Sequence, residues 1–266
     1  MSIRANRTLR SLLLVPALAL IVFVVVVPGV QALLILLFAS DGAGPLENLK
    51  VFADPAFGDA LRNTLVLMVV LLPVQALVAV ALARLIAARF RGATFLRYLV
   101  VLPLAVSDLA AGLLWLSFFT DRGYLSSALQ SAGLIAQPMA WLGFDSYGGM
   151  LAAIVVAETW RTTGVLLLPI LARLRLSTTG LSWSVFRSSL WPALLLRAIL
   201  GLQTFAVVVA LVGRNLPVVA GEAYTQLVTN RDQQLAAACA VAILAIATLA
   251  GVVYLRLAST RVSVGR

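Results

Sequence analysis

Reactive side chains are scarce in this sequence. Its 266 residues include no histidine, a single lysine (Lys50) and a single cysteine (Cys239). A disulfide within the chain and histidine-based metal or nucleophile chemistry are therefore excluded. Cys239 lies inside an apolar run, which is typical of a buried structural thiol.

Sequence patterns for catalysis are lacking as well. The phosphate-binding pattern Gly-x-x-x-x-Gly-Lys-Ser/Thr does not occur, no close pair of acids is placed for general acid–base work, and no metal-ligand spacing is present. We therefore predict that the chain is not an enzyme, carries no cofactor or metal, and has no ATP site of its own.

Apolar residues, in contrast, make up 62% of the chain, and the mean hydropathy is +1.05. Because a soluble domain is about 45–50% apolar, the excess is predicted to face lipid. An all-α, polytopic membrane protein with six transmembrane helices is expected, from apolar runs at 12–38, 64–88, 98–119, 149–174, 192–213 and 234–256. The first run is too long for the apolar region of a signal peptide, which favours an uncleaved first helix.

The placement of charge predicts the orientation of these helices. Arginines without any acid occupy the N-terminus, the connection 84–97, the connection 173–187 with Arg197 just inside the next span, and the C-terminal tail. The other connections, 39–63, 120–148 and 214–233, contain eight of the ten acids. Under the positive-inside rule both termini are cytoplasmic, and the formal charge of +10 reflects topology rather than nucleic-acid binding.

The two remaining acids, Asp108 and Glu158, lie within the predicted spans, and Arg161 follows Glu158 closely. Glu158 and Arg161 are three residues apart, so they share a helix face and can pair, while Asp108 follows Pro103 and Ser107. A charge in the bilayer needs a partner or a water-filled space. These residues therefore either line a polar path that opens outward or form structural ion pairs and a local hydrogen-bonded knot.

The stretch 175–192 is a polar interruption between two apolar runs, and it contains arginines and hydroxyl side chains but no acids. Residues 177–190 are long enough for a docking helix of two turns, with Leu181, Val185 and Phe186 on one face. The alternative is a simple cytoplasmic loop whose tryptophans anchor at the membrane interface.

An ordered series of short motifs runs along nearly the whole chain. It begins with Ser11-Leu-Leu-Leu-Val-Pro-Ala-Leu-Ala-Leu and continues through Asn63-Thr64. The later members are Arg91-Gly-Ala-Thr-Phe-Leu-Arg, Leu102-Pro103, Asp121-Arg-Gly-Tyr-Leu, and Trp160 with Thr163-Gly164. This series resembles the maltose-type, binding-protein-dependent sugar permeases of ABC importers.

The resemblance implies a type I importer permease in the bacterial cytoplasmic (inner) membrane, forming half of a pathway for a sugar or a similar polar organic solute. Its expected partners are a second permease subunit, two ATP-binding subunits, an extracytoplasmic solute-binding protein and the lipid bilayer, but no nucleic acid. Residues 1–63 would hold the first helix and an acidic outward loop. Residues 64–260 would form a five-helix core with a coupling loop near 175–191.

In that family, a Glu-Ala-Ala…Gly element in this loop docks the ATPase. Here Trp183, Phe186 and Pro192 keep the family's later spacing, but the Glu-Ala-Ala element is absent and Gly180 is one position off the motif glycine. A degenerate permease acting as a scaffold or regulatory subunit is therefore an alternative, and an ion-driven secondary transporter is a second one.

With a sugar as the solute, the candidate path residues are those able to offer aromatic surfaces or hydrogen bonds at membrane depth. They are Asp108, Trp115, Glu158, Trp160, Arg161 and Gln203. Packing is an equally ordinary role for the two tryptophans.

Overall fold

The computed structural model describes residues 15–16, 18–20, 22–38, 48–88, 90–143, 145–176 and 183–262, and it gives no side-chain detail for 175–188, 254 and 257–262. All regular elements in these ranges are helical, which confirms the all-α prediction. Termini orientation stays a prediction.

Four helical segments are long and apolar enough to cross a membrane without a sharp bend: Leu18–Phe38, Pro55–Ala87, Tyr147–Leu174 and Gln233–Val253. They contain, in order, η1 (Val22–Val26) with α2 (Val27–Phe38), α4 (Pro55–Ala87), most of α8 (Tyr147–Leu176) and most of α12 (Gln233–Val262).

The third and fifth expected spans are broken. In the third, α5 (Ala93–Val101) and η3 (Leu102–Ala105) are followed by α6 (Asp108–Phe119), with a bend of 108°. In the fifth, α9 (Trp183–Leu202) and α10 (Ala206–Val212) enclose a bend of 58°. The predicted count of six spans therefore holds only if each bent pair is one span.

Local sequence explains the sharper break. Pro103 cannot donate a backbone hydrogen bond, so the chain changes to a short 3-10 turn at η3. Val106 and Ser107 are extended, and the Ser107 hydroxyl then caps α6 by accepting a hydrogen bond from the Ala110 N–H at 3.2 Å. Pro103 and Ser107 thus end one helix and start the next, whereas the partner of the Asp108 carboxylate is Arg161 of α8 rather than this turn.

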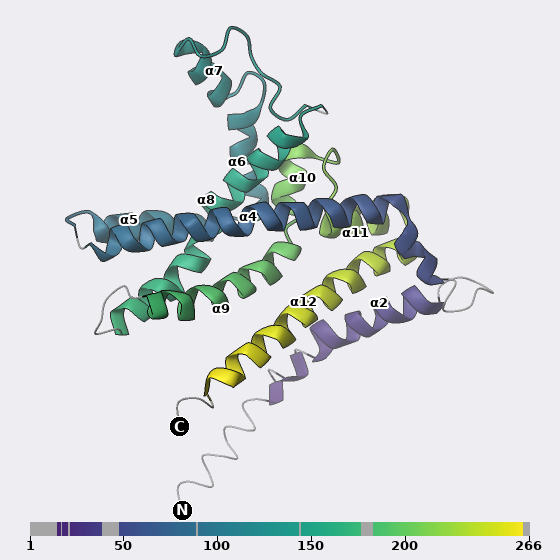
Figure 1. Ribbon diagram of the computed structural model, residues 1–266. Coiled ribbons are helices and arrows are strands. Elements are labelled where there is room, and N and C mark those ends of the chain that lie inside the picture. Colours follow the sequence, from purple (N-terminus) through teal and green to yellow (C-terminus); the bar gives the residue numbers. More distant parts are fainter. Residues whose placement is uncertain are drawn as a thin grey trace, which may run out of the picture.

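Short helices lie between the spans. They are η2 (Leu49–Ala53), α7 (Tyr124–Ser131), α11 (Val219–Thr225) and η4 (Gln226–Asn230). Figure 1 shows α7 at the far end of α6, and α11 near the start of α4. Both helices belong to segments that the charge pattern assigns to the outer side.

The packed centre is formed by α4, α8, α9 and α10. One apolar cluster joins Leu67 and Leu71 of α4 to Ile154 of α8 and Val207 of α10. A second cluster joins the α4 helix to α8 and α9, and its buried members include Ala79, Leu166, Ile170 and Ala193. At the edge, α2 and α12 run side by side (Figure 1), and α12 also packs against α9, α11 and the beginning of α4.

Candidate functional site

A layer of polar side chains separates the two apolar clusters. It is contributed by Gln75 of α4, Glu158 and Thr162 of α8, and Arg197 of α9, all of which are buried. On α4 and α8 these residues lie between the positions that the helix gives to one cluster and those that it gives to the other. The layer therefore ties three helices together in the middle of the packed centre.

Glu158 accepts hydrogen bonds from two arginines. Arg197 Nη2 lies 2.6 Å from Oε2, and Arg161 Nη2 lies 3.1 Å from Oε1. The second contact is the i, i+3 pair predicted from the sequence, which is confirmed. The Arg197–Glu158 contact joins α9 to α8, and removing either partner would leave a buried charge uncompensated.

Neutral groups complete the layer. Arg197 Nε donates to Gln75 Oε1 at 2.9 Å and to Thr162 Oγ1 at 3.1 Å. Gln75 Nε2 in turn donates to the Glu158 carbonyl at 3.0 Å and to Thr162 Oγ1 at 2.8 Å. The polar atoms of this layer thereby satisfy one another, as burial requires.

Arg161 extends the network to the third span. Its Nη1 lies 2.8 Å from Oδ1 of Asp108, the first residue of α6. The Asp108 side chain is 39% exposed, whereas the side chains of Arg161, Arg197 and Glu158 are 15%, 2% and 0% exposed. The network thus begins in the core and reaches the surface of the chain at Asp108.

An aromatic cluster adjoins the charged one, because Trp160 is the neighbour of Arg161 in the chain. Its ring packs edge-on against Trp115 of α6, with ring centroids 6.0 Å apart. Trp115 also stacks on Phe119 at 5.8 Å and contacts Phe118 at 5.3 Å. The buried Trp115 Nε1 has no hydrogen-bond partner among the described residues.

Five of the six candidate path residues are therefore brought together, as Asp108–Arg161–Glu158 and Trp115–Trp160. Gln203 is exposed at the break between α9 and α10 and takes no part in the hydrogen bonds of this network. Gln75, Thr162 and Arg197 were missed. A glutamine at position 75, isolated in an apolar run, was the available signal for the first of them.

The assignment of Arg197 needs a correction. The charge pattern of the sequence placed it with the basic cytoplasmic flank, just inside the fifth span. It lies 14 positions beyond Trp183, the first residue of α9, and is 1% exposed against Glu158. A guanidinium so far into a span needs a carboxylate partner, which makes it part of the site and not of the flank.

The coupling-loop residues are described only in part. Gly180 lies outside the described residues, and for Trp183 and Phe186 only the backbone is described, in the first turn of α9. Pro192 lies inside the same helix. The helix expected at 177–190 is thus seen from residue 183 onward, and it continues without a break into the fifth span as α9.

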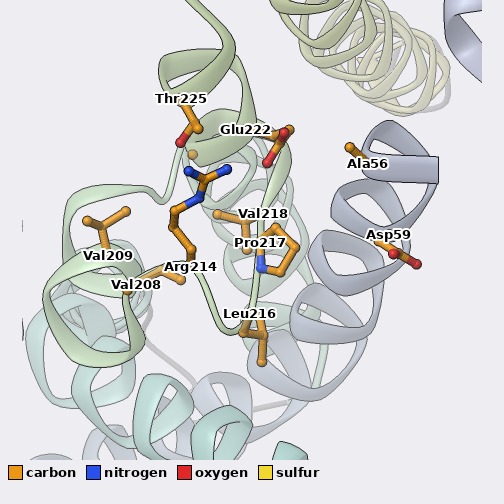
Figure 2. Close-up of a pocket in the computed structure, with 12 residues that line it drawn as sticks. Ala56, Asp59, Val208, Val209, Arg214, Leu216, Pro217, Val218, Glu222 and Thr225 are labelled. Carbon is orange, nitrogen blue, oxygen red and sulfur yellow. The ribbon is translucent and has the colours of Figure 1, made fainter. Parts of the chain in front are cut away.

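A separate cavity of about 240 Å³ opens near the start of α4, between α10 and α11. Asp59, Arg214 and Glu222 contribute charges to its lining, and in Figure 2 the Arg214 side chain extends toward Glu222 and Thr225. Glu222 also accepts a hydrogen bond from Gln226 Nε2 at 2.6 Å. No pattern in the sequence indicated this cavity.

Within the part of the chain that the structure describes, no group of three or more acidic or cysteine side chains is arranged to hold a metal ion.

Curated proteins similar to this chain are permease proteins of transport systems, although no family model matches it. The lactose transport system permease protein LacF of Rhizobium radiobacter is 30% identical over 170 residues, which cover 62% of this chain and 56% of LacF. The sn-glycerol-3-phosphate transport system permease protein UgpA of Agrobacterium fabrum is 31% identical over 164 residues, which cover 59% of this chain and 54% of UgpA. The chain thus matches about half the length of these relatives.

A longer match exists at lower identity. The sulfoquinovosyl glycerol transport system permease protein SmoG of Agrobacterium fabrum is 25% identical over 287 residues, which cover 96% of this chain and 92% of SmoG. The resemblance to ABC sugar permeases that the sequence motifs indicated is confirmed by these relatives.

Solved structures agree on the fold. A bacterial ABC transporter involved in the import of the acidic polysaccharide alginate has a chain that superposes with a TM-score of 0.68 at 16% identity, over 99% of this chain and 98% of that one. The same score, at 18% identity, is found with a bacterial alginate ABC transporter in complex with an alginate pentasaccharide-bound periplasmic protein. At such identities the likeness shows the importer-permease fold alone.

Proposed function

We propose that this relative of ABC sugar permeases is one membrane-spanning subunit of a binding-protein-dependent importer in the bacterial inner membrane. It forms half of the pathway for a sugar or a similar polar organic solute. The observation that carries this proposal is the buried polar layer that reaches the subunit surface at Asp108, within a chain related to such permeases. A second permease, two ATP-binding subunits and a solute-binding protein are the proposed partners.

Within this function, Asp108, Trp115, Trp160 and Arg161 are proposed to line the pathway. They occupy the crossing of α6 and α8, and charged groups at membrane depth are found where a span faces a water-filled space or a partner. Glu158 is proposed to contribute indirectly, by holding the Arg161 side chain in position. Gln203 is proposed to line the path at the other break, between α9 and α10.

Co-purification in mild detergent tests the assembly. The tagged chain is expected to bring down a second permease and an ATPase, and uptake by the reconstituted complex is expected to require ATP and a solute-binding protein. Absence of both subunits, or uptake that follows a proton or sodium gradient after ATP depletion, contradicts the proposal.

The docking element for the ATPase is proposed to be the first two turns of α9. Only six residues separate Leu176, the end of α8, from Trp183, so a separate helix of two turns has no room between them. Since α9 continues from Trp183 through Pro192 to Arg197, its beginning and the buried network belong to one continuous helix.

Phe186→Asp tests this element. The new charge is expected to abolish at least nine-tenths of the solute-stimulated ATPase activity while the second permease still co-purifies. Ser184→Asp is the matched control, because residue 184 lies about 200° around the helix from residue 186. Unchanged activity in Phe186→Asp would favour the second candidate function, a scaffold or regulatory subunit, for which the absent Glu-Ala-Ala element is the specific observation.

A further inference from the structure

The four charges at the centre of the spans balance one another. Arg161 binds both Asp108 and Glu158, and Arg197 binds Glu158. Two carboxylates thus face two guanidiniums, and both guanidiniums are engaged. At this depth the described part of the chain has no arginine left over to receive a negatively charged solute.

The group presented at the surface is an acid. Asp108 is the most exposed member of the network, and its Oδ1 accepts from Arg161, while a carboxylate has further lone pairs to accept other donors. Asp108 begins α6, whose 12 residues span about 18 Å, so it lies well inside the third predicted span. A charge there faces water or protein rather than lipid.

An apolar platform lies beside this acceptor. Trp115 is seven residues beyond Asp108 on α6, which places both on one face of the helix two turns apart. Trp115 is held by Trp160 and Phe119, and its Nε1 has no partner among the described residues. An aromatic surface beside a carboxylate acceptor suits the C–H face and the hydroxyls of a sugar ring.

We propose that this face of the pathway selects an uncharged, hydroxyl-bearing solute and disfavours anionic ones such as uronates, phosphates and sulfonates. The inference rests on the proposed function. An anion brought to Trp115 would meet Asp108 with no free cation to compensate, so like charges would repel in a low-dielectric site. The predicted outward segments, with eight acids against five basic residues, have the same sign.

The similar proteins include transporters of both uncharged and anionic solutes. The solutes in their names include the uncharged sugar lactose, but also sn-glycerol-3-phosphate and the acidic polysaccharide alginate. Similarity alone does not decide between the two classes, whereas the charge balance around Arg161 favours the uncharged one.

Direct binding to the purified chain with its co-purifying subunits tests the selection. Solute binding is followed by tryptophan fluorescence, with Trp115→Phe to identify the signal, using methyl galactoside against methyl galacturonide and methyl glucoside against methyl glucuronide. At least one neutral sugar is expected to bind ten times more tightly than its uronate. Equal affinities, a tighter uronate, or no binding by any of the four sugars overturns the inference.

Asp108→Asn tests the assigned cause. It leaves Arg161 and Arg197 sharing Glu158, so the exposed face gains one net positive charge. Neutral-sugar binding is expected to weaken several-fold, and uronate binding to strengthen at least tenfold. Asp121→Asn, in an exposed outward loop, is expected to change the ratio less than twofold, because a solvent-exposed charge is screened within about 8 Å.

An unchanged ratio in a folded Asp108→Asn protein also overturns the inference. The wild-type comparison needs no variant, so a variant that fails to fold leaves that test intact. Failure of the proposed function has a different signature, which is ATP-independent uptake or the absence of ATPase subunits. Neither result alters the ratio of neutral-sugar to uronate affinity.

Discussion

The polar layer of α4, α8 and α9 and the α2–α12 pair use opposite means to hold helices in a bilayer. In the most apolar window of α8, 56% of residues are buried, against 22% in α12 and 6% in the first span. α8 contributes Glu158, Arg161 and Thr162 to interhelical bonds, whereas α2 buries only Leu36, against small residues of α12.

The difference shows which helices have their relative positions fixed by specific contacts. Lipid tails are as apolar as leucine, so helices in a membrane gain from close packing and polar contacts rather than from hydrophobic transfer. α8 has directional contacts to three helices and can occupy one position only. The α2–α12 pair is described by packing contacts, and its outer surface is consistent with contact to lipid.

Neutralising the central carboxylate, Glu158, is expected to cause the largest loss of stability. Glu158→Gln leaves the buried Arg197 without a counter-charge, and the free energy of unfolding is expected to fall by about 3–5 kcal/mol. SDS titration in mixed micelles, followed by far-UV circular dichroism, measures the loss. Adding Arg197→Met should recover part of it.

Glu222→Gln is the matched control for that experiment. Glu222 is also buried, but it accepts its hydrogen bond from the neutral Gln226 side chain, so a loss of about 1 kcal/mol is expected. Equal losses of unfolding free energy for Glu158→Gln and Glu222→Gln would show that the arginine network adds no more stability than an ordinary buried hydrogen bond.

A bulkier side chain at the close contact between α6 and α10 is expected to cause an intermediate loss of stability. A Cβ on Gly112 would lie 2.5 Å from the Ala210 Cβ and 3.1 Å from the Val207 carbonyl oxygen. Gly112→Val should therefore push the helices apart and cost about 1–3 kcal/mol of unfolding free energy. Gly148→Val, at a position where nothing lies within 4 Å of the added Cβ, should be milder in the same titration, and a reversed order contradicts the packing argument.

The smallest effects are expected at the α2–α12 pair. Leu36 is 2% exposed, and Leu36→Ala should cost about 1 kcal/mol, because packing is lost while apolar surroundings remain. Leu34, on the same helix, is 52% exposed, and Leu34→Ala should change the unfolding free energy by less than about 0.5 kcal/mol. Equal losses would show that α2 is held by something other than its contact with α12.

Hydropathy located the apolar spans, and charge spacing found the Glu158–Arg161 pair, because both depend on neighbours in sequence. The contact of Arg197 with Glu158 joins residues 39 apart, and no local pattern specifies which face of α9 meets α8. The 108° bend had a visible cause in Pro103, but its size depends on packing, such as that of Gly164 against Leu104. The contacts and angles between helices that are distant in sequence are therefore what the sequence alone could not predict.

The unbroken course of α9 has a mechanical consequence. Arg197 lies 14 residues, about 21 Å, from Trp183, and five residues, about 8 Å, from Leu202. With Arg197 held by Glu158 as a fulcrum, a sideways displacement at the Trp183 end is reduced about threefold at Leu202. A shift of about 3 Å at the beginning of α9 would thus move the break at residues 203–205 by about 1 Å in the opposite direction.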